Sequence, residues 1–224
     1  MRFSAVLTTL LFLLATPAAD AAIFGTAEFR AGSLAALPQW RRVLAQIEKE
    51  RPVYARCARD RESCPNRAMY AWQSLLRGLA GAPIERQIRR VNRFVNQWRY
   101  RTDQRNYGRS DYWASPSEFL ARSGDCEDYA IMKYVSLRAL GVPADKLRLV
   151  VLQDTLRQIP HAVLAVYLDK DIYILDNQTD AILTDRRISH YRPYYSVNEN
   201  ARWAHVAAGT PLLSLKLPQV QPAK

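Results

Sequence analysis

The chain has 224 residues, 49% of them hydrophobic, and its 32 lysines and arginines against 21 acidic residues give a formal charge of +11. This length suits one domain with a substantial core. The positive charge favours an acidic partner, and because the sequence contains no nucleic-acid-binding motif, we expect an acidic protein, an anionic polysaccharide or a lipid surface rather than nucleic acid.

The first 21 residues have the features of a secretory signal peptide. Arg2 makes the start positive, residues 5–15 form an apolar run, and small residues at 19 and 21 suit cleavage before Ala22. The run is too short for a comfortable membrane span, although an uncleaved anchor is the alternative. We therefore predict an exported protein that does not span the membrane.

Two of the three cysteines lie close together in a polar, arginine-rich stretch. Cys57 and Cys64 are separated by six residues, a spacing that a disulfide can close in an oxidising compartment. Two free thiols are the alternative. Pairing them leaves Cys126 as the odd cysteine, which in an exported protein is either an intermolecular crosslink or a reactive group.

Hydrophobic periodicity predicts helices first and strands afterwards. Apolar residues recur at helical spacing in residues 38–50, 82–100 and 126–140. A loop with one short helical turn joins the last two of these helices.

The later segments alternate as strands do, over residues 146–153, 161–168 and 172–176. The expected fold class is therefore α+β, with N-terminal helices packed on an antiparallel sheet. We expect one domain over residues 22–205, followed by a tail over residues 206–224 that is mobile at its end.

The turn between the last two predicted strands decides which side chains meet. If residues 169 and 170 form a two-residue hairpin loop, counting outward puts Asp176 opposite Val163. His161 is then the diagonal neighbour of Asp176 on the same face, at roughly 7–8 Å. A different turn would shift the register by one residue and place the two side chains on opposite faces.

Cys126, His161 and Asp176 suggest a catalytic triad in chain order. A thiol in the first turn of a helix gains from unpaired amides and from the positive end of the helix dipole. An imidazole at a strand start can take the thiol proton, and a carboxylate on the next strand can orient the imidazole. His190 and His205 lie in segments without an obvious carboxylate neighbour, so His161 is the best candidate base.

Three stretches resemble the bacterial transglutaminase-like cysteine proteinases, which are periplasmic proteases that release large biofilm adhesins from the outer membrane. They are "SDYWASPSEFL", "GDCEDYAIMKYVSLRALGVP" and "HAVLAVYLDKDIYILDN". The resemblance extends over residues 35–200 and implies a papain-like, transglutaminase-like core in a periplasmic protein. It implies Cys126 as the nucleophile, His161 as general base and then acid, and Asp176 as the residue that orients the imidazole.

The same resemblance implies partners and a cofactor. The partners are a large repeat-rich adhesin as the substrate and an inner-membrane receptor for cyclic di-GMP as the inhibitor. The cofactor is calcium, held beside the nucleophile. The implied ligands are Asp125, Glu127 and Asp128.

Three carboxylates beside Cys126 would raise the pKa of its thiol, and bound calcium would cancel that penalty. Calcium takes about six to eight oxygen ligands, so neighbouring residues cannot complete its shell, and loop groups such as Asp103 or Asp111 would be needed. The alternative is that the three carboxylates only cap the helix and complement its dipole.

Two other classes of function stay open. A transglutaminase or another acyl transferase would use the same three residues with an amine in place of water as the acceptor. A basic, non-catalytic module that binds an anionic polymer would need no triad. The reactivity of the Cys126 thiol distinguishes this last class from the enzymes.

Overall fold

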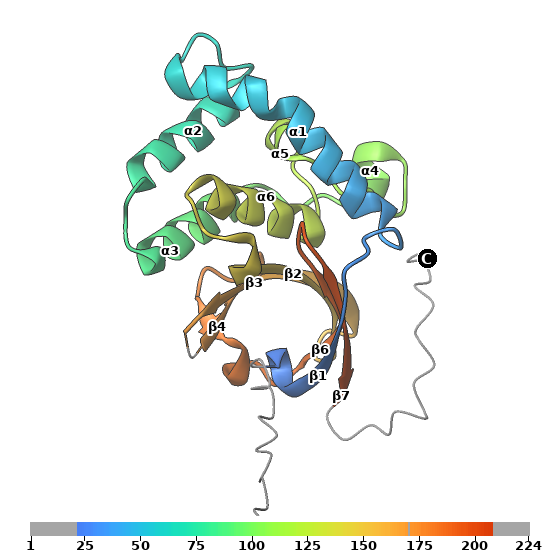
Figure 1. The fold of residues 1–224 in the computed structure, drawn as a ribbon. Helices are drawn as coiled ribbons and strands as arrows, with labels where there is room; N and C mark the ends of the chain where they lie inside the picture. The colour runs from blue at the N-terminus through green and yellow to red at the C-terminus, as the bar shows by residue number, and fades with distance from the viewer. Residues whose placement is uncertain (1–21, 170, 208–224) are drawn as a thin grey trace, which may run out of the picture.

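The computed structural model describes residues 22–169 and 171–207. The expected signal peptide and all but the first two residues of the expected tail lie outside the described residues. A layer of helices lies on one side of a curved antiparallel sheet (Figure 1). This arrangement confirms the expected α+β class.

Six α-helices, all between β1 and β2 in the chain order, lie within the described residues. They are α1 (Pro38–Arg59), α2 (Arg67–Leu79), α3 (Ile84–Val95), α4 (Asp103–Tyr107), α5 (Pro116–Arg122) and α6 (Cys126–Ala139). α6 packs against α3 and α5 and also against the sheet (Figure 1), so every residue from Asp128 to Leu137 is buried. Within the described part of the chain, no helix is both long and apolar enough to cross a bilayer.

The described residues also form seven strands of one sheet. They are β1 (Thr26–Ala31), β2 (Leu147–Asp154), β3 (Ile159–Leu168), β4 (Asp171–Leu175), β5 (Leu183–Thr184), β6 (Tyr191–Val197) and β7 (Arg202–Ala207). Their order is β1-β7-β6-β2-β3-β4-β5. β1 pairs with β7, so the first and last strands lie side by side. β7 ends at Ala207, two residues beyond the domain end expected at residue 205.

The β3–β4 register agrees with the hairpin expected from the sequence. Leu168 pairs with Asp171, and Leu164 pairs with Leu175, the residue before Asp176. His161 and Asp176 therefore lie on one face of neighbouring strands, as the two-residue loop required.

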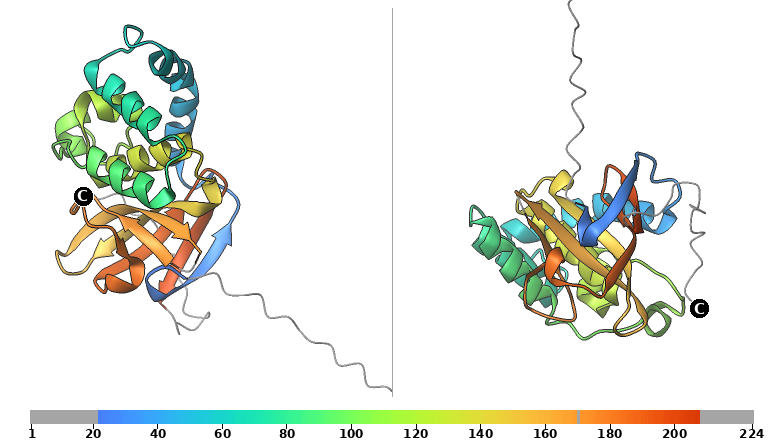
Figure 2. Two further views of the ribbon diagram at one scale, coloured as in Figure 1. Left: turned by 90° about the vertical axis from the view of Figure 1, so that its left-hand side faces the viewer. Right: turned by 90° about the horizontal axis from the view of Figure 1, so that it is seen from below.

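The sheet has a hydrophobic cluster on each face. The larger cluster lies between the helices and the sheet, where Trp40, Trp72 and Leu164 are among the buried residues. The smaller cluster lies on the other face and includes Val163 and Ile174. Both views in Figure 2 show the helices on one side of the sheet. Because hydrophobic clusters cover both faces of β2 and β3, the sequences of these two strands are nearly continuous runs of apolar residues.

Several elements differ from the sequence-based expectation. α1 continues past residue 50 to Arg59, through Pro52, which is exposed and removes only one helical hydrogen bond. α2 was not expected, although its apolar residues recur at helical spacing and the Asn66 side chain caps it by accepting from the Met69 amide (2.8 Å). The pairing of β1 with β7 joins segments too distant in sequence to give a local signal.

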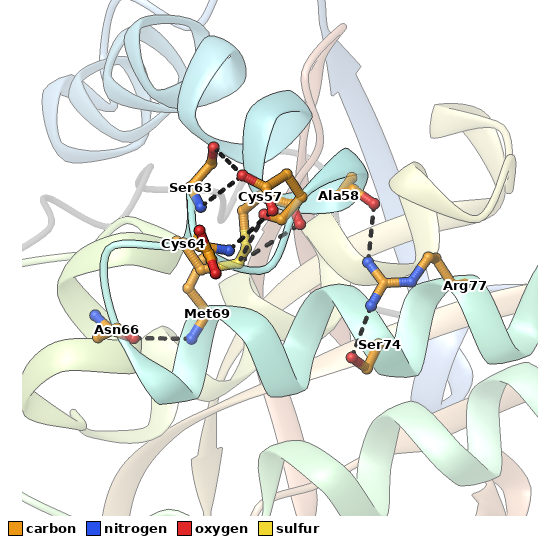
Figure 3. The surroundings of a disulfide bond; sticks show 10 residues. Cys57, Ala58, Ser63, Cys64, Asn66, Met69, Ser74 and Arg77 are labelled. Atoms are coloured by element: carbon orange, nitrogen blue, oxygen red, sulfur yellow. Dashed lines mark hydrogen bonds between the residues drawn. A yellow bond between two sulfur atoms is a disulfide. The ribbon is translucent and has the colours of Figure 1, made fainter.

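A disulfide joins Cys57 to Cys64, as the sequence predicted. Figure 3 shows it at the corner between α1 and α2. Nearby, Arg77 of α2 donates to the carbonyl of Ala58 (2.9 Å). The bond and this contact together fix the angle at which α2 leaves α1.

We expect reduction of this disulfide to lower the free energy of unfolding by about 2.5 kcal/mol, because the bond closes a short loop in the unfolded chain. Urea denaturation with and without reductant measures this change in the free energy of unfolding. The Cys126→Ala variant is used so that the third thiol cannot react. A variant with Cys57→Ser and Cys64→Ser should not respond to reductant. Alkylation of either cysteine in the folded, unreduced protein would contradict the pairing.

Candidate active site

The turn before α6 is built around a buried carboxylate. Asp128 Oδ1 accepts from the amide of Ala114 (2.6 Å), and Asp128 Oδ2 accepts from the amide of Asp125 (3.2 Å). A Cβ atom at Gly124 would lie 2.0 Å from Asp128 Oδ2, so only glycine fits there. The two residues together hold the start of α6, where Cys126 is the first helical residue.

Ser123 adds a second constraint on this turn. Its φ of 66° is in the left-handed region, which costs roughly 1–3 kcal/mol for a residue other than glycine. Its amide donates to the carbonyl of Phe119 (2.7 Å), and its own carbonyl accepts from the side chain of Asn106 (3.2 Å). Its hydroxyl donates to the carbonyl of Arg99. Three segments therefore hold the strained residue in place.

The Cys126 thiol lies between a carboxylate and a strand. Sγ donates to Glu127 Oε2 (3.2 Å), and the amide of Ala162 in β3 donates to the sulfur. Burial raises the pKa of the Cys126 thiol well above its usual value, and the charges of Glu127 and Asp125 raise it further. The carboxylates therefore oppose thiolate formation, as the sequence indicated.

His161 and Asp176 form a buried pair. His161 Nε2 lies 2.9 Å from Asp176 Oδ1, and both side chains are buried. Asp176 also accepts from the amide of Gln178 (2.9 Å) and from the hydroxyl of Tyr191. Burial alone would raise the pKa of Asp176, but the bonds from His161, Tyr191 and Gln178 lower it to about 2.

This pairing fixes the tautomer of the neutral imidazole. An ionised Asp176 can only accept hydrogen bonds, so Nε2 of His161 carries the proton and Nδ1 is left with a lone pair. His161 is the residue before Ala162, whose amide contacts the Cys126 sulfur. The structure therefore brings the start of β3, the start of α6 and the end of β4 together.

Three carboxylates form a group that could hold a cation. Asp103, Asp125 and Glu127 each offer an oxygen, and these atoms lie within 4.8 Å of one another. Oδ1 of Asp103 and Oδ1 of Asp125 are buried and have no hydrogen-bond partner. Burial raises the pKa of Asp103 to about 7, and the charge of Asp125 contributes to this shift. Buried oxygens without donors fit a cation that prefers oxygen ligands, as calcium does.

This group differs from the ligand set that the resemblance implied. Asp128 stays outside it, because both of its oxygens accept from backbone amides. Asp103 is the third member of the group instead. It is one of the two loop residues that the sequence suggested as additional calcium ligands. The other, Asp111, accepts from the side chains of Gln39 (2.8 Å) and Trp113 (3.0 Å), so its oxygens already have donors.

The other two histidines lie apart from this site. His205 is buried and bonds through its ring nitrogens with the hydroxyls of Thr26 (3.1 Å) and Ser196 (2.8 Å). His190 packs its ring against Tyr191, with 4.6 Å between the centroids. Among the described residues, the ring of neither histidine bonds with the turn from Ser123 to Cys126.

Sequence reasoning missed three residues near the site. Tyr191 supports Asp176 from β6, a strand that was not predicted. Tyr100 is half exposed, and burial and the charges of Cys126 and Asp125 raise the pKa of its hydroxyl. Lys133 stands in an otherwise apolar part of α6, and a lysine in a buried helix is the signal that could have identified it.

Lys133 is buried completely, and its ammonium has no hydrogen-bond partner among the described residues. The ring centroid of Tyr129 lies 6.0 Å from Nζ. Burial lowers the pKa of Lys133 to about 7, while the charges of Asp176 and Asp180 oppose this shift. A buried ammonium therefore lies in the field of the carboxylate that orients His161.

Comparison with known proteins identifies a family. A family model of the bacterial transglutaminase-like cysteine proteinases (BTLCP) matches residues 49–210. The comparison with curated proteins gives no match.

Solved structures of LapG from Legionella pneumophila are similar to this chain. The calcium-bound LapG structure is 38% identical, with a TM-score of 0.57 over 61% of this chain and 77% of that chain. A second LapG structure is 35% identical, with a TM-score of 0.60 over 67% of this chain and 87% of that one. An EGTA-treated LapG structure has the same identity and TM-score and covers 67% and 84%.

We expect Lys133→Met to stabilise the protein, and to do so more at pH 6.5 than at pH 9.5. The folded-state pKa of about 7 lies below the ordinary lysine pKa of 10.5, so burying the charge costs up to a few kcal/mol below pH 7. That cost falls as pH rises toward the unfolded-state pKa. Urea denaturation at both pH values measures the change, and Lys146→Met, at an exposed position, is the matched control. An equal gain at both pH values would contradict a charge effect.

Proposed function

This chain belongs to the bacterial transglutaminase-like cysteine proteinase family, and we propose that it is a periplasmic, calcium-dependent cysteine endopeptidase. Its proposed substrate is the N-terminal region of a large surface adhesin, whose cleavage releases the adhesin and promotes biofilm dispersal. An inner-membrane receptor for cyclic di-GMP is the proposed inhibitor. The location, the adhesin and the receptor follow from the family resemblance of the sequence motifs.

One observation carries the proposed chemistry. The amide of Ala162 donates to the sulfur of Cys126, and the residue before it, His161, is bonded to Asp176 at 2.9 Å. The thiol at the helix start thus contacts the residue that follows His161, and Asp176 orients the imidazole of His161 through Nε2. This is the arrangement that nucleophilic catalysis by cysteine requires.

The roles follow from the geometry. Cys126 Sγ attacks the carbonyl carbon of the scissile peptide, and its proton passes to Nδ1 of His161, because Nε2 is engaged with Asp176. Amides in the first turn of α6, which have no intrahelical acceptor, can donate to the oxyanion. The imidazolium then protonates the leaving amine as the C–N bond breaks and a thioester remains.

Hydrolysis reverses these roles. His161 takes a proton from water, whose oxygen attacks the thioester carbon, and returns it to the sulfur of Cys126 as the C–S bond breaks. Asp176 stays ionised throughout, since its three donors hold its pKa at about 2. Tyr191 and Gln178 keep the carboxylate in place and so act through it.

Asp103, Asp125 and Glu127 are the residues that would hold calcium. When bound, the ion would supply positive charge beside the thiol and offset the carboxylates that raise its pKa. The two buried oxygens without donors support this assignment, and one of the similar LapG structures is calcium-bound.

We expect Cys126→Ala and His161→Ala to abolish cleavage, since one removes the nucleophile and the other its base. Asp176→Asn should keep residual activity, and Tyr191→Phe should lower kcat about tenfold through loss of one hydrogen bond to a charged group. Gel analysis of an adhesin N-terminal fragment incubated with each variant and calcium provides the measurement. His190→Ala removes an imidazole outside the site and should remain active. Near-normal turnover by Cys126→Ala would end the protease assignment.

We expect chelation to stop cleavage, and Asp103→Asn to weaken calcium binding by on the order of a hundredfold, since it removes a charged ligand. Asp111→Asn is the matched control, because it removes a neighbouring negative charge whose oxygens already have donors. Its effect on affinity should be several times smaller. Calorimetric titration of both variants gives the dissociation constants, and equal losses would show that overall charge, not coordination by Asp103, determines binding.

A further inference from the structure

Four arginines line a hollow beside the turn that carries Cys126. Its volume is about 510 Å³. We call it the arginine hollow. Its basic residues are Arg99, Arg101, Arg105 and Arg122, and its other lining residues are Trp98, Asn106, Leu120, Ala121 and Ser123. All four arginines are exposed, and the half-buried ring of Trp98 contributes apolar surface.

These four arginines lack the carboxylate partners that seven other arginines have among the described residues. Arg138 pairs with Glu199 (2.8 Å) and Arg148 with Glu28 (2.6 Å). Among the described residues, no carboxylate lies within ion-pairing distance of any guanidinium in the arginine hollow. Four uncompensated positive charges around one concave surface attract anions, and the guanidinium fork matches the geometry of a carboxylate.

The acidic group of the candidate active site does not supply the missing charge. Asp103 lies between Arg101 and Arg105 in sequence, yet it is buried and forms an ion pair with neither of them. The segment between α3 and α4 therefore separates a positive surface from a negative one. Tyr100, between Arg99 and Arg101, lies on the negative side, where the charges of Cys126 and Asp125 affect its hydroxyl.

The hollow is close to the nucleophile along the chain. Ser123 lines it and precedes Cys126 by three residues, and the backbone amide of Arg101 donates to the carbonyl of Gly124 (2.8 Å). Three residues span at most about 10 Å. A polypeptide extended across Cys126, at about 3.3 Å per residue, would reach the hollow about three residues from its reacting carbonyl.

We propose that the arginine hollow binds an acidic segment of the substrate polypeptide, with Asp or Glu side chains about three residues from the cleaved bond. This inference rests on the proposed protease function, because only a protease would bind the acidic segment as part of its substrate. The guanidinium groups bind the carboxylates, while Trp98 and Leu120 contact the methylene groups of the acidic side chains. Acidic residues at this position therefore lower KM, and they leave kcat unchanged because they contact no reacting atom.

A binding experiment tests the hollow without any cleavage. Fluorescein-labelled hexaglutamate is titrated into Cys126→Ala protein with calcium at low salt, and anisotropy gives the dissociation constant. Adding Arg101→Gln, Arg105→Gln and Arg122→Gln should weaken binding at least tenfold. The matched control adds Arg86→Gln, Arg89→Gln and Arg90→Gln, which remove the same charge from exposed positions on α3. The control should change the dissociation constant less than twofold.

Equal weakening in the two triple variants would overturn the proposal, since it would reflect net charge alone. So would failure of the parent to bind hexaglutamate more tightly than hexaglutamine. Circular dichroism checks that the variants fold, and the double variants Arg101→Gln/Arg105→Gln and Arg86→Gln/Arg89→Gln repeat the comparison with a smaller change.

Cleavage kinetics then separate the two proposals. With an adhesin fragment, the triple variant in the hollow should raise KM severalfold at unchanged kcat, and the control variant should not. If the unmodified protein cleaves no adhesin fragment, the proposed protease function is wrong. The hexaglutamate titration still shows whether the arginine hollow binds an acidic peptide. If cleavage occurs but KM is the same in both triple variants, the hollow does not bind substrate and the protease function stands.

Discussion

The candidate active site depends on one buried carboxylate that takes no part in the chemistry. Asp128 accepts from the amides of Ala114 and Asp125 and thereby joins the loop before α5 to the residue that precedes α6. Its carboxylate occupies the space where any residue other than Gly124 would place a Cβ atom. Because this turn is packed inside the protein, the start of α6 and Cys126 are held against β3.

Burial alone does not decide which acidic groups at the site are ionised. Asp176 is buried, but three donors hold its pKa at about 2, so it is ready to orient an imidazole. Asp103 is buried as well, yet it keeps one oxygen without a donor, and its pKa rises to about 7. The difference lies in the number of hydrogen-bond donors and in the charge of the neighbour, which is Asp125 for Asp103 and His161 for Asp176. It separates a carboxylate that the protein satisfies by itself from one that a cation would satisfy.

Local patterns predicted the parts of the site that lie within one hairpin or one helix. The β3–β4 register follows from a two-residue loop, so the approach of His161 to Asp176 could be derived by counting. The carboxylate group could not be derived in this way. Asp103 lies 22 residues before Asp125 and approaches it only through the tertiary fold, while Asp128 lies three residues after Asp125 but is used as a cap. The pairing of β1 with β7 escaped prediction for the same reason, because it joins the two ends of the described chain.

Two surfaces of opposite charge adjoin the nucleophile, and they would act on a polypeptide in different ways. The arginine hollow attracts acidic residues, whereas Asp103, Asp125 and Glu127 repel them. One divalent cation would cancel only part of three carboxylate charges, so some repulsion would persist with calcium bound. Attraction at one point and repulsion about three residues away would set the register of a bound chain more strictly than either alone. On the proposed function, the bond presented to Cys126 would therefore lie in a stretch without acidic residues, next to one that contains them.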